Sequence, residues 1–306
     1  MAKILTIAKL WLFLLFVKGG SFFILTTKFK ESVACDKINL KLQAAKNEGE
    51  IFMQVNEFDY YERIGNWNFD DIKCVTVRHT DWEFYDVIRA HTNATSNCLD
   101  LGTGGGEKVL EFYPEVGMVT ATDFSSEMIK TANENLKKHP GKRVKFAQMD
   151  NLNMKVPNNS FDLISARHTV IHAKQIYDAL VPGGVLVIEG VDQKDCWEMK
   201  ELFGRGQAFN DPISIAEKDY QDLVDAGFSK IERVEILEDE YYETEDDLMA
   251  LLLKAPILDD FSEFDNSDFE HKAMIEKDLF DEYVRRFKSD KGILLKRVLY
   301  GIVATK

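Results

Sequence analysis

Short apolar runs alternate with amphipathic stretches from Trp82 to the end of this 306-residue chain, and this alternation constrains the fold more than any other feature. The runs are short enough for buried strands, and the stretches between them repeat apolar residues at helical spacing. The expected strands are residues 97–101, 118–122, 144–149, 161–166, 185–188, 230–237 and 292–305. The pattern predicts an α/β fold, a Rossmann-like, doubly wound sheet of seven strands.

A glycine-rich run directly follows the first expected strand and opens a helix. It reads Asp100-Leu-Gly102-Thr-Gly104-Gly-Gly106. Glycines there let the main chain turn sharply and approach a ligand closely. A dinucleotide fingerprint would need glycine at position 107, where this chain has Glu107, so a nicotinamide-dependent oxidoreductase is the weaker alternative.

Two further acidic positions follow the next two expected strands. Asp123 lies 21 residues after Gly102 (123 − 102), a spacing at which an acid can bind ribose hydroxyls. Asp150 and Asn151 end the third strand, where a carboxylate can accept a hydrogen bond from an adenine amino group. Ligands bind at the carboxyl ends of strands in a parallel sheet, so these positions predict one nucleotide-like site.

These motifs, together with Ser160-Phe-Asp-Leu and Leu180-Val-Pro-Gly-Gly, resemble the successive motifs of class I S-adenosylmethionine-dependent methyltransferases. The ubiquinone- and menaquinone-biosynthesis enzymes and the biotin-pathway enzymes are the most similar groups. The resemblance implies S-adenosylmethionine as cofactor, with the glycines around its methionine part, Asp100 near its amino group, Asp123 at the ribose and Asp150 with Asn151 at the adenine. The full set of implied cofactor-binding residues is Asp100, Gly102, Thr103, Gly104, Gly106, Asp123, Phe124, Asp150, Asn151 and Arg167.

The resemblance also implies in-line transfer of a methyl group, for which holding the acceptor close and aligned supplies much of the catalysis. A general base is needed only when the acceptor atom is weakly acidic. Arg167 and His168, directly after the fourth strand, are the expected catalytic residues, and His172 is a second candidate. Each histidine could instead be a capping or surface residue. No metal site is predicted.

The acceptor is expected to be a small molecule. The formal charge of the chain is −14. An acidic surface repels phosphates and gains no binding free energy from counterion release, so a nucleic-acid substrate is disfavoured. No Asn-Pro-Pro-Tyr or Asp-Pro-Pro-Tyr motif follows the fourth strand, which weakens methylation of bases or protein glutamine. A non-catalytic S-adenosylmethionine-binding protein stays open as an alternative, and the cysteine pattern gives little support to an arsenic methyltransferase.

The expected organisation has three parts. Residues 1–52 form an apolar extension, 53–95 a helical lead-in, and 96–306 the methyltransferase domain with a helical lid insertion at 244–291. Charged and glycine residues interrupt the apolar segment 4–27, so a membrane partner is expected only if that segment is a genuine anchor. Translation from Met53, with the preceding residues an artefact, or a dispensable extension is preferred over an anchor. Four scattered cysteines favour a reducing, cytoplasmic setting.

Overall fold

The computed structural model describes residues 14–18, 21–25, 69, 71–263 and 275–306. The chain divides into two units, residues 1–50 and residues 51–306. Among the described residues, no helix is both long and apolar enough to cross a membrane. Most of the segment 4–27 and most of the lead-in before residue 71 lie outside the described residues.

In the first unit, two strands form an antiparallel pair. Strand β1 (Leu14–Lys18) pairs with β2 (Ser21–Leu25), with Leu14 opposite Leu25 and Lys18 opposite Ser21. Both segments are rich in aliphatic and aromatic residues, which favour strands, and the sequence Gly19-Gly20 between them is typical of a tight hairpin.

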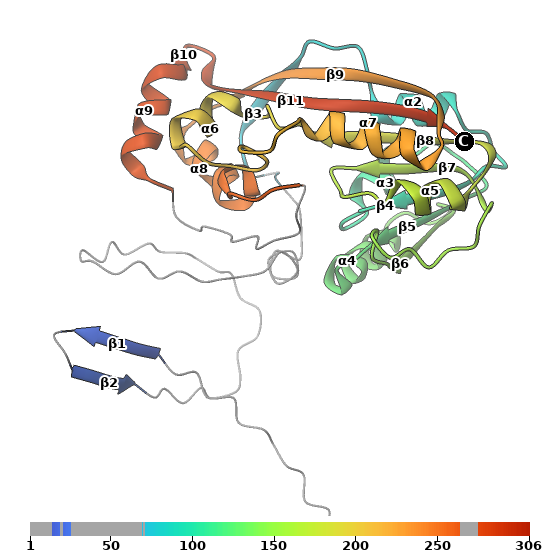
Figure 1. The fold of residues 1–306 in the computed structure, drawn as a ribbon, viewed down its shortest axis with the longest axis horizontal. Coiled ribbons are helices and arrows are strands. Elements are labelled where there is room, and N and C mark those ends of the chain that lie inside the picture. Colours follow the sequence, from blue (N-terminus) through green and yellow to red (C-terminus); the bar gives the residue numbers. More distant parts are fainter. Residues whose placement is uncertain (1–13, 19–20, 26–68, 70, 264–274) are drawn as a thin grey trace, which may run out of the picture. The chain divides into compact units, whose positions relative to one another are not determined.

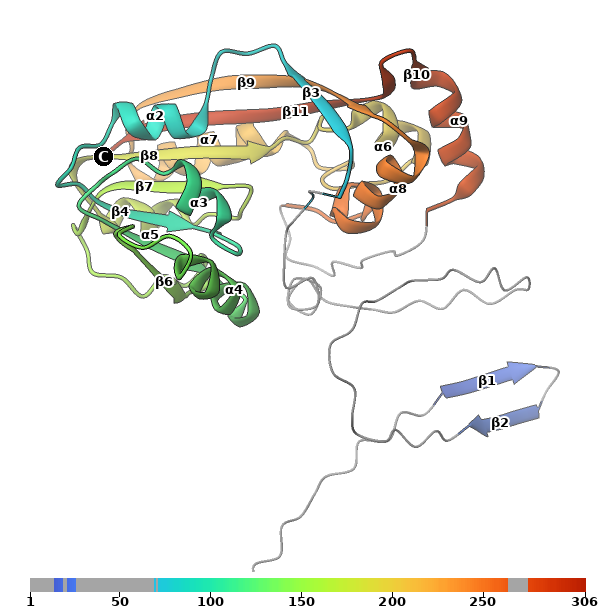
Figure 2. The ribbon, with the colours of Figure 1, turned by 180° about the vertical axis from the view of Figure 1, so that it is seen from behind.

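The second unit is built on one large mixed sheet with the strand order β3-β9-β11-β8-β7-β4-β5-β6 (Figures 1 and 2). Strands β6, β5, β4, β7 and β8 are parallel neighbours, whereas β11 runs antiparallel to both β8 and β9. The bounds are β3 Cys74–Arg78, β4 Asn97–Leu101, β5 Met118–Asp123, β6 Val144–Gln148, β7 Phe161–Arg167, β8 Leu180–Val191, β9 Ser229–Tyr242 and β11 Gly292–Thr305, with β10 (Lys288–Ser289) paired to β11. The seven predicted strands and their Rossmann-like arrangement are confirmed, with the order reversing at β4, while β3 and β10 extend the sheet to nine strands.

Helices cover both faces of this sheet, because alternate strand residues are apolar on each side. On one face, α2 (Phe84–Ala90) and α3 (Glu107–Phe112) pack on an apolar cluster that includes Cys98, Leu163 and Val187. On the other face, α5 (Ala173–Ala179) and α7 (Ile215–Ala226) pack on a cluster around Ile164 and Ile188. Helix α4 (Ser126–Leu136) is capped at its N-terminus by Ser125, whose hydroxyl accepts a hydrogen bond from the amide of Met128.

A helical group lies at the far end of the long strands β9 and β11 (Figure 1). It contains α6 (Trp197–Phe203), α8 (Glu245–Lys254), the 3-10 helix η1 (Pro256–Leu258) and α9 (Lys277–Phe287). These helices share an apolar cluster with Tyr242, Ile293 and Leu295 of the two strands. Helices α8, η1 and α9 lie within the predicted insertion, and residues 264–274 are outside the described residues.

Three local expectations need correction. Residues 74–78 of the predicted helical lead-in form an edge strand, since the alternating sequence Cys-Val-Thr-Val-Arg pairs with β9. Strand β8 begins at Leu180 and runs through Pro182-Gly183-Gly184, because Leu180 pairs with Phe161 and an irregularity between Phe161 and Leu163 absorbs the turn residues. Helix α6 was not predicted.

Candidate functional site

The glycine loop connects β4 to α3 in left-handed backbone conformations. The φ angles of Gly102, Gly104 and Gly106 are 71°, 57° and 75°, values that favour glycine. A Cβ on Gly106 would lie 2.6 Å from the ring of Phe146 on β6, so this glycine allows α3 to pack closely on the sheet. Gly102 and Gly104 shape the loop itself.

Asp123 joins the end of β5 to this loop. Its Oδ2 accepts a hydrogen bond from the amide of Gly104 at 2.9 Å, and its Oδ1 accepts one from the amide of Ser125 at 2.9 Å. Burial raises the pKa of Asp123, while the same amide bonds oppose the rise. A carboxylate has about four acceptor positions, so Asp123 retains the capacity to accept ribose hydroxyls.

Asp100 is the most deeply buried acid of the predicted site, at 4% exposure. The hydroxyl of Ser165 on β7 donates to its Oδ1 at 2.7 Å, and the hydroxyls of Tyr113 and Ser165 are 3.2 Å apart. Burial raises the pKa of Asp100 from an ordinary 3.8 to about 7, against the opposing hydrogen bond from Ser165. A cation bound beside this carboxylate would lower that pKa.

Asp150 and Asn151 follow β6 and point to different partners. Asp150 is exposed, and its Oδ1 accepts a hydrogen bond from the amide of Leu152 at 2.9 Å. Asn151 is buried and donates through Nδ2 to the Thr169 hydroxyl at 3.0 Å. Thr169 in turn lies against Gly102, where an added Cβ would be 2.6 Å from its side chain. The loops after β4, β6 and β7 therefore meet in one place.

Two buried oxygen atoms in these loops have no hydrogen-bond partner among the described residues. They are Oδ1 of Asn151 and Oγ1 of Thr103, the latter near the Asp100 carboxylate but outside hydrogen-bond geometry. Buried polar atoms are rarely left unpaired in native proteins, and an unpaired one indicates a missing water or ligand. Both atoms belong to predicted cofactor-binding residues, so the loops fit a polar ligand such as S-adenosylmethionine. Phe124 is half-buried beside them, and its carbonyl accepts a hydrogen bond from Gln148.

The two predicted catalytic residues converge on one carboxylate. Glu189 of β8 is 2% exposed, and its Oε1 lies 2.7 Å from Nε of Arg167 and 3.4 Å from Nε2 of His168. Burial alone would raise the pKa of Glu189, but His168 and Arg167 outweigh it and hold that pKa at about 2. His172 instead precedes α5, where its carbonyl accepts from the amide of Ile176.

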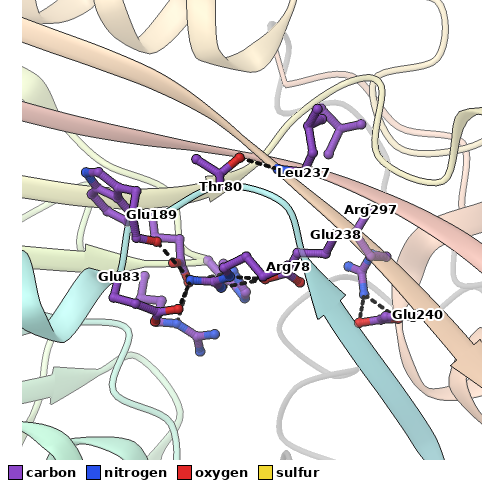
Figure 3. A network of polar contacts seen from close by, with 12 residues as sticks. Arg78, Thr80, Glu83, Glu189, Leu237, Glu238, Glu240 and Arg297 are labelled. Atoms are coloured by element: carbon purple, nitrogen blue, oxygen red, sulfur yellow. Dashed lines mark hydrogen bonds and ion pairs between the residues drawn. The ribbon is translucent and has the colours of Figure 1, made fainter.

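A belt of charged side chains continues from Glu189 across β11, β9 and β3. Residues at alternate positions of a strand share a face of the sheet. The strand registers place Glu189 opposite Gly301, and Glu238 opposite both Arg297 and Arg78. These side chains therefore lie on the same face of the sheet, the one that α2 covers. Figure 3 shows Arg78 between Glu83 and Glu238, and Arg297 beside Glu240. The Nη1 of Arg78 lies 2.6 Å from Glu83, and the Nη1 of Arg297 lies 3.1 Å from Glu240.

The belt separates two apolar clusters. On one side lies the cluster under α2 and α3, and on the other lies the cluster of the helical group. Arg297 also contacts Asp195, which follows β8, through two parallel bonds of 2.8 Å and 3.1 Å. The strand ends that carry Arg167 and Glu189 therefore adjoin a polar junction between the sheet core and the helical group.

Sequence reasoning missed Ser165, Thr169 and Glu189. A single carboxylate inside the apolar run Val-Leu-Val-Ile-Glu189 is a usable signal, since a charged residue in a buried strand needs a partner. Ser165 and Thr169 carry no comparable signal, because small hydroxyl residues are common in strands and loops.

Known proteins share this architecture. Residues 92–238 match the family model described as a methyltransferase domain. Phosphoethanolamine N-methyltransferase 2 of Caenorhabditis elegans is 35% identical over 98 residues, which are 29% of this chain and 22% of that protein. A demethylmenaquinone methyltransferase of Listeria welshimeri is 24% identical over 135 residues, 41% of this chain and 57% of that protein.

The chain thus spans between 22% and 57% of the length of these curated relatives. A crystal structure of a candidate methyltransferase from Bacillus halodurans C-125 has the same fold, with a TM-score of 0.50 at 15% identity over 73% of this chain and 98% of that one. The methyltransferase-domain match over residues 92–238 agrees with the resemblance of the motifs to class I S-adenosylmethionine-dependent methyltransferases.

Proposed function

We propose that this chain transfers a methyl group from S-adenosylmethionine to a small-molecule acceptor. The observation that carries the proposal is the meeting of three loops at the point where the strand order reverses, with two buried oxygens left without partners. Ligands of doubly wound sheets bind at this point. The domain match supports the same chemistry.

In this proposal the chain's own residues hold the cofactor by charge and shape. Asp100 faces the ammonium group of the methionine part, and Asp123 accepts the ribose hydroxyls while it fixes the glycine loop through Gly104. Asp150 and Asn151 border the adenine, beside Phe124. When bound, the cofactor supplies an electrophilic methyl group on a positively charged sulfur. Arg167 and His168 border the acceptor side.

Three observations favour a small acceptor. The charge of −14 disfavours nucleic acid. The polar belt adjoins the strand ends on one side and the helical group on the other, so the helices can exclude water from the reaction. The named relatives act on phosphoethanolamine and demethylmenaquinone, which are small molecules.

Cys74, Cys98 and Cys196 are unpaired, in keeping with the proposed cytoplasmic location.

Calorimetry on the full chain tests the cofactor. S-adenosylmethionine and S-adenosylhomocysteine should bind and NADH should not, and Asp123→Ala should weaken binding at least about tenfold through the lost charge-assisted bonds. Asp81→Asn, at an exposed position, is the matched control. Binding of NADH alone would refute the proposal. Cofactor binding without turnover of phosphoethanolamine, a demethylmenaquinone analogue or any other small acceptor would favour the non-catalytic alternative.

A further inference from the structure

Arg167 and His168, two successive residues at the end of β7, are both attached to Glu189. Besides the two side-chain contacts, the amide of His168 donates to the carbonyl of Glu189 at 2.8 Å. His168 is therefore held at its main chain and at its imidazole by the same residue. Such double attachment fixes the direction of a side chain more than one contact would.

The backbone of His168 is in a left-handed conformation, with a φ angle of 50°. Residues with a Cβ adopt this conformation at an energetic cost, which persists only where surrounding contacts enforce it. The main-chain bond to Glu189 is such a contact. It turns the imidazole back toward β8 and leaves 34% of the side chain exposed at the strand ends.

The contact with Glu189 also favours one tautomer of His168. Nε2 faces the Glu189 carboxylate at 3.4 Å, and a negative charge beside Nε2 favours the neutral ring that carries its hydrogen on this atom. Nδ1 then keeps a free lone pair. The neighbouring His168 and Arg167 hold the pKa of Glu189 below its ordinary value, so Glu189 does not itself take up a proton near neutral pH.

We propose that Glu189 is a positioning residue that presents His168 Nδ1 as the proton acceptor, and that the methylated atom of the substrate is a hydroxyl oxygen or an ammonium nitrogen. The inference rests on the proposed function. A carboxylate has already lost its proton at neutral pH and would need no such base. Hydroxyl and ammonium groups keep theirs, so their methylation requires one.

The acceptor's oxygen or nitrogen forms the new bond to the methyl carbon, while the carbon–sulfur bond breaks and its electron pair remains on sulfur. The acceptor's proton moves to Nδ1 of His168, and Glu189 faces the resulting imidazolium. The proton leaves to solvent through the exposed part of the ring.

The charged groups around His168 agree with this role. Partial burial of the ring, which remains 34% exposed, and the neighbouring guanidinium of Arg167 lower the pKa of His168 from its ordinary 6.5, with Arg297 acting in the same direction, while Glu189 opposes them. A lowered pKa favours the neutral ring at pH 7, which is the form that can accept a proton.

The first test is independent of activity. We would follow the imidazole resonances of the full-length protein by ¹⁵N NMR as a function of pH and assign His168 with His168→Gln. The wild type should carry its hydrogen on Nε2, and Glu189→Gln should lower the pKa of His168 and mix the tautomers. Glu189→Asp, which keeps the charge, should restore the pKa in part. A hydrogen on Nδ1 in the wild type would overturn the inference.

The second test measures turnover with S-adenosylmethionine and three probe acceptors: 2-aminoethanol, catechol and, as an acceptor that is already ionised at neutral pH, acetate. With the amine or the phenol, His168→Gln and Glu189→Gln should lower kcat about 100-fold with the cofactor Kd unchanged. The exposed changes His139→Gln and Glu134→Gln are the controls. Full kcat in His168→Gln, turnover of the carboxylate alone, or a wild type that binds S-adenosylmethionine but methylates none of the probes overturns the inference. A wild type that does not bind S-adenosylmethionine overturns the proposed function instead.

Discussion

Asp100→Asn should stabilise the ligand-free protein while weakening its binding of S-adenosylmethionine. The carboxylate is buried, and burial raises its pKa from 3.8 to about 7. Because the folded pKa lies above the unfolded one, ionisation destabilises the fold progressively as the pH rises from about 4 to about 7. The cost is about 2 kcal/mol at pH 5 and about 4 kcal/mol at pH 8, from 1.36 kcal/mol per pH unit.

An uncharged asparagine removes this pH-dependent cost. The free energy of unfolding of the variant minus that of the wild type should therefore be about 2 to 3 kcal/mol larger at pH 8 than at pH 5. Any packing cost of the amide is the same at both pH values. The change in this stability difference between pH 5 and pH 8 therefore reports only the ionisation of Asp100. Urea unfolding would show it as a relative midpoint shift of about 1 M.

The control is Asp81→Asn, because Asp81 is exposed and its substitution should change stability by less than about 0.5 kcal/mol at either pH. If Asp100→Asn and the wild type differ by the same amount at pH 5 and pH 8, the burial argument for Asp100 is wrong. Weaker cofactor binding by the same variant would show that the acid is retained for the ligand despite its cost.

Three further predictions concern the same architecture. Gly106→Ala should destabilise the fold by about 1 to 3 kcal/mol, because the new Cβ meets Phe146 at 2.6 Å and the φ angle is 75°; thermal unfolding would measure this, and an unchanged Tm would contradict the packing. Asp123→Asn should lower cofactor affinity less than Asp123→Ala, since the amide oxygen can still accept one main-chain bond; calorimetry with equal losses would contradict this. Tyr300→Phe removes the hydroxyl that donates to buried Asp219 at 2.5 Å, and burial raises the pKa of Asp219 to about 6. The loss should be about 1 to 3 kcal/mol at pH 8 and smaller at pH 5, where Asp219 is protonated, and urea unfolding showing equal losses would refute it.

The polar belt gives the helical group a physical connection to the site. Arg297 contacts Asp195 after β8 and Glu240 on β9, and these residues lie between the sheet core and the apolar cluster of the helices. Buried ion pairs of this kind are costly to break, since removal of one partner leaves an uncompensated charge. The belt therefore fixes the orientation of the long strands that carry the helices.

The sequence by itself determined the order of strands and helices from residue 97 onward and the three acidic positions at the strand ends. Apolar periodicity and turn residues are local signals, and the carboxyl end of a parallel strand is a fixed place in such a sheet. Asp100, Gly104 and Asp123 could be assigned to one site for that reason. The edge strand at Cys74–Arg78 was missed because a five-residue exposed strand depends on its pairing with β9.

Only the tertiary structure decided which side chains meet. Glu189 lies more than 20 residues after His168 in the chain, and the parallel pairing of β7 with β8 brings Arg167 opposite it. The contact between Thr169 and Gly102 and the charged belt across four strands likewise depend on strand register. Register is set by pairing between distant segments, so no local pattern in the sequence specifies it.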